Sequence, residues 1–256
     1  IVAVHSTLLR EAIILFGITT AVRLIIIPSE KRVRLLSYGL ALVVLYASYI
    51  HRPDNVIIYA AAFGTGLFVY NIESGYLSKR MVVITASLSP LFVVGIWPVI
   101  QFGIERLTYI REVRGGGRTD YLINTIPETL PELAAFSWIG VAYFLYAPFP
   151  WMIETVPDLL VSIEGVITMG FTVAALWGVR TLFHKNKPAT VALVVGLLLA
   201  VVFYGVGTVN YGTGMRHRQM FSWIIFLFGG IGIAEQVRFV GLSNAIQSQP
   251  DETASD

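Results

Sequence analysis

The chain has 256 residues, of which 55% are hydrophobic and only 13% are charged, with a formal net charge of +2 and no cysteine. Soluble domains carry about 25% charged residues, so this chain has too few charges to cover a water-facing surface and is not a soluble globule. The small net charge gives no reason to expect nucleic acid as a partner, and the lack of cysteine excludes disulfides and thiolate metal sites.

Apolar runs long enough to cross a bilayer, which takes about 20 residues per helix, recur along the chain. The runs are continuous rather than alternating, so they predict helices and not the strands of a barrel. The predicted spans are 12–27, 35–50, 56–72, 81–104, 134–147, 159–183, 189–209 and 220–234. The sequence thus predicts an all-α, polytopic transmembrane helical bundle of about eight spans over residues 1–240, multi-pass in the cell membrane and surrounded by the lipid bilayer.

Two polar segments depart from this pattern. Residues 105–133 form a long polar connection, and Gly115-Gly116-Gly117 within it is a flexible joint rather than a phosphate loop, because no Gly-Lys-Ser/Thr follows. Thr125 is predicted to cap a helix, with Glu128 as its reciprocal partner. Residues 241–256 are polar and are predicted to form a disordered tail.

The distribution of Lys and Arg predicts the orientation, since cytoplasmic loops collect these residues. The connection after the fourth span and the loop after the sixth are predicted to be cytoplasmic on the basis of Arg106, Arg111, Arg114, Arg118, Lys185 and Lys187. Residues 148–158 contain no Lys or Arg and are predicted to face outward, as is the loop after the seventh span. Lys31, Arg32 and Arg34 would then also face outward; a miscounted early span would remove this conflict.

The segment before the last span is the clearest candidate site, with the sequence Asn210-Tyr211-Gly212-Thr213-Gly214-Met215-Arg216-His217-Arg218. Its glycines and asparagine allow an unusual turn, and a helix start presents free N–H groups and a positive dipole. Arginine adds forked donors that match phosphate oxygens. The pattern predicts an anion site formed by Asn210, Arg216, His217 and Arg218. The alternative is that Arg216 and Arg218 anchor a helix end among lipid headgroups.

This segment also carries a resemblance. Asn210-x-Gly-Thr-x-x-Arg-His-Arg before a last hydrophobic helix resembles the C-terminal signature of polytopic membrane proteins of surface-polysaccharide assembly, namely oligosaccharide repeat-unit polymerase-like proteins and lipid-linked-sugar glycosyltransferases. Upstream, Phe144-Leu145-Tyr146-Ala147-Pro148-Phe149-Pro150-Trp151 is similar to a segment of the same group. In that group a helix with an early acid and a late Trp-Gly follows, here Glu164 and Trp177-Gly178. The resemblance covers about residues 133–234.

The resemblance implies a membrane component of cell-surface glycan assembly that handles a polyprenyl-(pyro)phosphate-linked oligosaccharide at the outer face, alongside other glycan-assembly proteins. As an oligosaccharide polymerase or glycosyltransferase, it would hold the pyrophosphate with Arg216, His217 and Arg218. The acidic, arginine-adjacent pair near the N-terminus of such glycosyltransferases is not evident, Arg10-Glu11 being the nearest match. The alternatives are a transporter or flippase of the lipid-linked sugar, against which the apolar spans count, and a non-catalytic scaffold.

Glu164 is the candidate catalytic residue. An ionisable group at membrane depth is costly and usually faces a partner or a watery cavity, and this carboxylate is a candidate general base toward a sugar hydroxyl. The alternative is that Glu164 reaches water near the interface. His5, His51, His184 and His217 are scattered without ligand spacing, so neither a metal nor another cofactor is expected.

Overall fold

The computed structural model describes residues 55–78, 116–125 and 127–247, together with isolated positions within 39–50 and 80–113. In this part of the chain every regular element is a helix, as the sequence predicts. The elements are α3 (Val56–Glu73), α5 (Leu130–Tyr146), the short 3-10 helix η2 (Pro150–Met152), α6 (Val156–Lys185), α7 (Lys187–Gly207) and α8 (Tyr211–Gln247).

Two of the described helices, α6 and α7, are long and apolar enough to cross a membrane, and α8 is a third if its two bent parts form one span. Helices α3 and α5 are apolar but shorter. The predicted spans 12–27, 35–50 and 81–104 lie wholly or largely outside the described residues. The described part of the chain therefore supports a membrane protein with two or three crossing helices, and the total of about eight stays a prediction.

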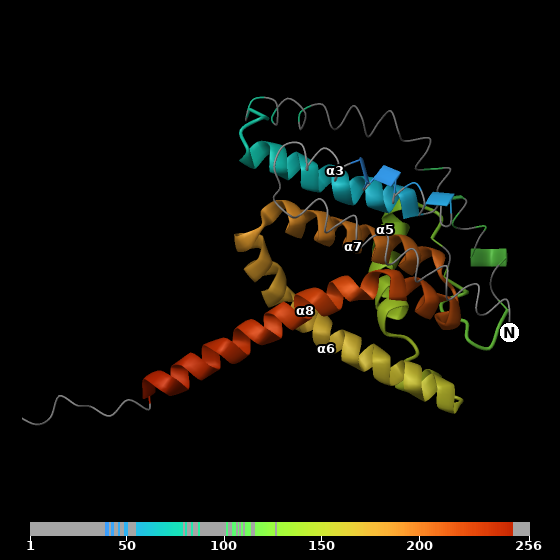
Figure 1. Ribbon diagram of the computed structural model, residues 1–256. Helices are drawn as coiled ribbons and strands as arrows, with labels where there is room; N and C mark the ends of the chain where they lie inside the picture. The colour runs from blue at the N-terminus through green and yellow to red at the C-terminus, as the bar shows by residue number, and fades with distance from the viewer. Residues whose placement is uncertain are drawn as a thin grey trace, which may run out of the picture.

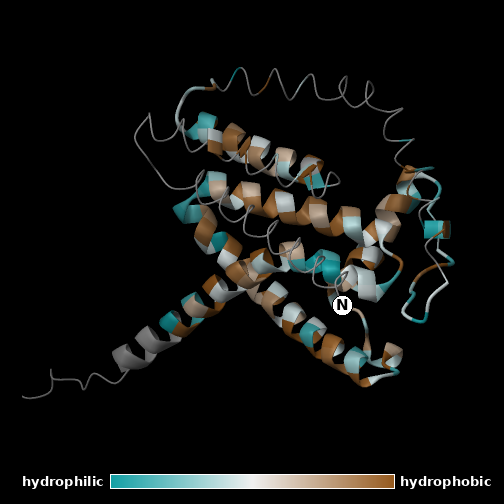
Figure 2. Cartoon of the chain, turned by 45° about the vertical axis from the view of Figure 1, so that its right-hand side comes forward, coloured by the Kyte–Doolittle hydropathy of each residue, from teal (hydrophilic) through white to brown (hydrophobic). Residues whose placement is uncertain are grey.

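The helices form two packed pairs. Figure 1 shows α3 beside α7, with α6 and α8 crossing each other below them. Helices α3 and α7 run antiparallel, because Glu73 at the end of α3 pairs with Lys187 at the start of α7 at 3.1 Å. Figure 2 shows hydrophobic residues around the helices and hydrophilic residues gathered toward helix ends. A helix that is apolar on all sides is typical of a buried or membrane-spanning element.

The helix starts follow local capping rules. Thr129 accepts a hydrogen bond from the Glu132 N–H at 3.4 Å, and the Glu132 carboxylate accepts one from the Glu128 N–H at 3.0 Å, so α5 begins at Leu130. The predicted cap at Thr125 is therefore wrong by one turn, since the same Thr-x-x-Glu pattern recurs at Thr129 with a proline in the first turn. Helix α6 begins with a capping box between Thr155 and Asp158.

Glycines bring α6 and α8 into backbone contact where they cross. A Cβ atom on Gly178 would collide with the Phe228 carbonyl, and one on Gly232 would collide with the Ala174 carbonyl. Gly229 packs in the same way against the backbone of Phe171. In a membrane, where apolar surface gains little by leaving lipid, close packing through small residues is a main source of helix association.

Helix α8 bends by 62° between its parts Tyr211–Arg218 and Ser222–Arg238. The indole N–H of Trp223 donates to the Met220 carbonyl at 3.0 Å, so a carbonyl at the bend has a side-chain partner. Helix α8 continues to Gln247, into the predicted disordered tail 241–256, whose last residues lie outside the described part.

Segment 116–125 lies at the same end of the bundle as the loops after α5 and α7. The Tyr211 N–H donates to the Thr119 carbonyl at 3.0 Å, and Asp120 forms an isolated antiparallel bridge with Asn210. We call this region the polar end; it comprises residues 116–125, 145–158 and 208–218, together with Glu164.

The predicted orientation, which put 105–133 and 148–158 on opposite sides of the membrane, is wrong. Arg118 of the first segment pairs with Asp158 of the second at 2.8 Å. The physical reason is that Arg111 and Arg118 contact other parts of the protein, so they do not mark a free cytoplasmic loop.

Candidate functional site

Arg218 joins the two segments on which the resemblance rests. Its Nη1 atom donates to the carbonyls of Leu145 and Ala147, each at 3.0 Å, just where α5 ends. The side chain is only 1% exposed. The residues around Phe144–Trp151 and those around Asn210–Arg218 thus form one structural unit, although more than fifty residues separate them in the sequence.

Arg218 also meets Glu164, the candidate catalytic acid. Its Nη2 atom lies 3.3 Å from a carboxylate oxygen of Glu164, whose side chain is 40% exposed. Within the described part of the chain, neither Nη2 nor Nε of Arg218 has a hydrogen-bond partner with acceptable geometry. The structure therefore brings these two predicted site residues together as an ion pair whose acidic member is open to the surroundings and whose basic member is enclosed.

The other predicted site residues have different surroundings. Asn210 caps α8, since its side-chain oxygen accepts hydrogen bonds from the N–H groups of Gly212 and Thr213 at 2.8 and 3.1 Å. Arg216 is exposed. The His217 ring lies 4.6 Å from the Tyr204 ring. Residues two apart on a helix do not share a face, which explains why Arg216 points outward while Arg218 is buried.

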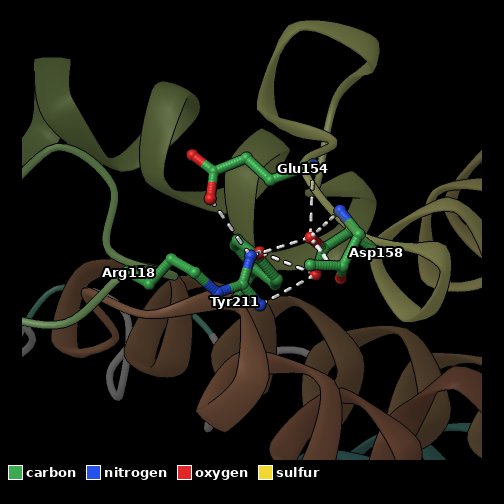
Figure 3. Close-up of polar contacts among 5 residues, drawn as sticks. Arg118, Glu154, Asp158 and Tyr211 are labelled. Carbon is green, nitrogen blue, oxygen red and sulfur yellow. Dashed lines mark hydrogen bonds and ion pairs between the residues drawn. The ribbon is translucent and has the colours of Figure 1, made fainter.

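A second charged cluster joins three segments at the polar end, as Figure 3 shows. Arg118 donates to both carboxylate oxygens of Asp158, at 2.8 and 3.3 Å, and Tyr211 donates to the same carboxylate at 2.9 Å. The exposed Glu154 is a weaker partner of Arg118, at 3.4 Å. The hydrogen bonds that Arg118 donates to Asp158 and, to a lesser extent, to Glu154 raise the pKa of Arg118 above its ordinary value, so this guanidinium stays charged.

Sequence reasoning did not select this cluster, although one signal for it exists. Thr155-x-x-Asp158 before an apolar run is a capping box, which places the Asp158 carboxylate at the first turn of α6. Nothing in the sequence shows that Arg118, forty residues earlier, returns to this carboxylate.

Arg111 and Tyr121 were also missed and are both buried. Arg111 donates to the carbonyls of Val206 and Leu122, each at 2.6 Å, and is 1% exposed. Its guanidinium lies 4.6 Å from the Phe136 ring centre, a cation–π contact. Tyr121 is 4% exposed, and its hydroxyl has no hydrogen-bond partner among the residues that the structure describes. Burial raises the pKa of the Tyr121 hydroxyl, although the nearby Arg111 and Arg218 act in the opposite direction.

A row of aromatic rings leads from the buried Tyr121 to the surface. The Tyr121 and Tyr143 ring centres lie 5.1 Å apart, those of Tyr143 and Phe149 5.0 Å, and those of Phe149 and Trp151 4.9 Å. Phe149 and Trp151 are stacked nearly parallel, and Trp151 is 75% exposed. The second resemblance segment therefore presents one free aromatic face on a short loop that contains two prolines.

The polar end thus contains buried and exposed arginines, carboxylates beside them and an exposed aromatic face. Such groups suit the binding of an anion next to a ring that can stack on an aromatic side chain. Within the described residues no group of three or more His, Cys, Asp or Glu side chains has an arrangement that could hold a metal ion. No protein-family model matches the sequence, and no curated protein and no solved structure is similar to it.

Proposed function

We propose that the chain is a multi-pass component of the cell membrane that acts in cell-surface glycan assembly on a polyprenyl-phosphate-linked oligosaccharide, as a polymerase or glycosyltransferase working beside other proteins of the pathway. The observation that carries the proposal is the contact of Arg218 with the carbonyls of Leu145 and Ala147. The two sequence segments that resemble the same group of proteins thus contribute to one site, which supports the proposal.

In this proposal the phosphate lies at the start of α8. Arg216 is exposed and, among the described residues, has no carboxylate within ion-pair distance, so it can attract an anionic headgroup. Arg218 lies one half-turn deeper, in a setting with little water, where a guanidinium stabilises negative charge on a leaving phosphate more strongly than it would in solvent. The exposed face of Trp151 offers a stacking surface for a sugar ring.

Glu164 keeps its proposed place near the chemistry, with one qualification. Its carboxylate is 40% exposed and lies 3.3 Å from Nη2 of Arg218, so it is close to the position proposed for the phosphate. Glu164 would act as a general base on a sugar hydroxyl once Arg218 has turned to another anion.

A second candidate function is transport of the lipid-linked sugar without bond formation. The 62° bend of α8 favours it, because the bend directly follows Arg218. Transporters often place interrupted helices at their binding sites, where the broken ends face the substrate. A bundle of about eight spans, as the sequence predicts, is compatible with either function.

The exposed Arg216 tests the proposed function with little risk to folding. We expect Arg216→Gln to lower the amount and chain length of surface polysaccharide in cells that depend on this protein. The purified variant should bind a prenyl phosphate several-fold more weakly. The matched control is Arg180→Gln, which removes an exposed arginine farther along α6. Normal polysaccharide in a strain lacking the whole protein, or equal effects of the two substitutions, would refute the proposal.

A further inference from the structure

Several hydrogen-bond donors are left unmatched in the interior of the polar end. In the described part of the chain, Nη2 and Nε of Arg218 and the hydroxyl of Tyr121 have no hydrogen-bond partner. Both side chains are nearly inaccessible, at 1% and 4% exposed. Unmatched buried donors are rare because each loses its water without compensation, so a group of them requires an explanation.

These donors lie near one another. A Cβ atom built on Gly214 would be 3.7 Å from the Tyr121 hydroxyl, and Gly214 precedes Arg218 by one helical turn on the same face of α8. Tyr121 packs in one cluster with Ala147, whose carbonyl accepts from Arg218 at 3.0 Å. The tyrosine hydroxyl and the guanidinium therefore bound a common region.

Glu164 is the anion that faces this region now. Its carboxylate lies 3.3 Å from Nη2 of Arg218, yet the contact lacks hydrogen-bond geometry. Arg218 is 1% exposed and Glu164 is 40% exposed, so the carboxylate is the member of the pair that can leave. No other carboxylate among the described residues lies within ion-pair distance of Arg218.

We propose that Glu164 occupies the position of a phosphate group, and that the phosphate of a prenyl-phosphate lipid displaces it and binds to Arg218 and Tyr121. This inference rests on the proposed function and names the part of the substrate that the inner site takes. A phosphate fits the donors better than a carboxylate does, because its oxygens point in three directions and can accept from Nη2, Nε and the hydroxyl at once. Glu164 then sets a threshold for binding, since only an anion that outcompetes it enters.

Arg218 and Arg216 have different functions in this site. Nη1 of Arg218 already holds the Leu145 and Ala147 carbonyls, which fixes the plane of the guanidinium. The remaining edge of that plane is the one that faces Glu164. Arg216 lies outside on the exposed side of the helix and serves the approach of the anion rather than its final position.

The test uses the full-length protein in detergent and measures binding of farnesyl phosphate, farnesol and inorganic phosphate. Glu164→Gln keeps the shape of the side chain and removes its charge, so we expect it to bind farnesyl phosphate roughly tenfold more tightly than the unaltered protein. Tyr121→Phe keeps the ring that packs on Tyr143 and should weaken binding several-fold in both backgrounds. Glu154→Gln, which removes a carboxylate beside Arg118, is the control and should change nothing.

The outcomes separate this inference from the proposed function. If the unaltered protein binds farnesyl phosphate no better than farnesol, the proposed function itself is refuted. If it binds the phosphate but Glu164→Gln brings no gain, or an equal gain for farnesol, Glu164 is not a substitute for phosphate. Tighter binding of inorganic phosphate than of farnesyl phosphate would overturn the assignment to a lipid headgroup. Unchanged binding in Tyr121→Phe would remove Tyr121 from the site.

Discussion

Helices α6 and α8 meet twice, and the two meetings differ in kind. At the polar end they are joined through side chains: Glu164 pairs with Arg218 at 3.3 Å, and Tyr211 donates to Asp158 at 2.9 Å. Farther along, where they cross, they are joined through backbones, with Gly178 against the Phe228 carbonyl. The first contact depends on charge and the second on the absence of a side chain.

The difference shows how stability and function divide between these regions. Backbone contact between apolar helices needs no water and no partner ion, so the crossing can hold the bundle together whatever occupies the polar end. Among the residues that the structure describes, Arg218 and Tyr121 at the polar end have buried donors without partners. Such donors lower the stability of the fold but are available to bind a ligand. We therefore expect substitutions at the crossing to affect folding, and substitutions at the polar end to affect folding less and binding more.

The largest expected effect comes from filling the crossing. Gly178→Leu places a side chain where the Phe228 carbonyl lies, and a backbone atom cannot rotate away. We expect a loss of at least about 4 kcal/mol in the free energy of unfolding, or no folded protein. Thermal unfolding in detergent measures the effect.

The same helix provides the control for that substitution. A Cβ atom on Gly170 meets nothing within 4 Å, so Gly170→Leu adds an apolar side chain that faces outward. This variant should unfold close to the temperature of the unaltered protein. If both leucines are equally harmful, the backbone contact between α6 and α8 is not the reason.

The next effect concerns the buried arginine of the polar end. Arg218→Met removes two hydrogen bonds to the carbonyls of Leu145 and Ala147 and leaves Glu164 without its counter-ion. We expect a loss of about 3 kcal/mol in unfolding free energy, because the carbonyls that end α5 lose their partner. Arg216→Met, on the exposed side of the same turn, should stay within about 0.5 kcal/mol. Equal stability of the two variants would contradict the buried role of Arg218.

Local composition predicts the apolar helices of this protein but not the contacts between distant segments. Continuous apolar runs depend on local composition alone, so the predicted spans 159–183 and 189–209 agree with α6 and α7. The rule that a charge at membrane depth usually faces a partner or a watery cavity predicts a special environment for Glu164, but it does not name Arg218, which the structure places 3.3 Å away.

Long-range contacts at the polar end have no such local signal. Arg111 and Arg118 led to the prediction of a cytoplasmic loop, because the count of positive charges assumes that no charge is paired within the protein. Each of these arginines is instead engaged with a distant segment, Arg111 with the Val206 carbonyl and Arg118 with Asp158. Which distant segment each arginine contacts depends on the three-dimensional fold and cannot be predicted from a single sequence.

A smaller effect is expected at the start of α6. Asp158→Asn removes a charged acceptor that caps the helix and accepts from Arg118 and Tyr211. We expect a loss of about 1–2 kcal/mol, as for other helix caps with added hydrogen bonds. Glu154→Gln alters the exposed partner of Arg118 and should cost less than about 0.5 kcal/mol. If the two variants lose equal stability, the cluster acts as a surface charge pair and not as a lock between segments.

The smallest expected effect is a dependence on pH at Asp120. Partial burial acts to raise the pKa of Asp120, but the N–H groups of Gly117 and Gly116 and the amide of Asn210 outweigh it, so the pKa lies below the ordinary value of 3.8. A carboxyl whose pKa is lowered by folding adds stability above its ordinary pKa and loses that contribution as the pH falls through the folded value. Unfolding measured from pH 6 down to pH 3 should therefore show a decline that Asp120→Asn reduces by about 0.5 kcal/mol. Asp120 contacts Asn210, which caps α8, and not the α6–α8 crossing. The decline in stability should therefore be accompanied by faster hydrogen exchange of the Gly116 and Gly117 amides, while the amides of α6 keep their exchange rates. Equal increases in the exchange of these glycines and of α6 would show that acid weakens the whole bundle instead.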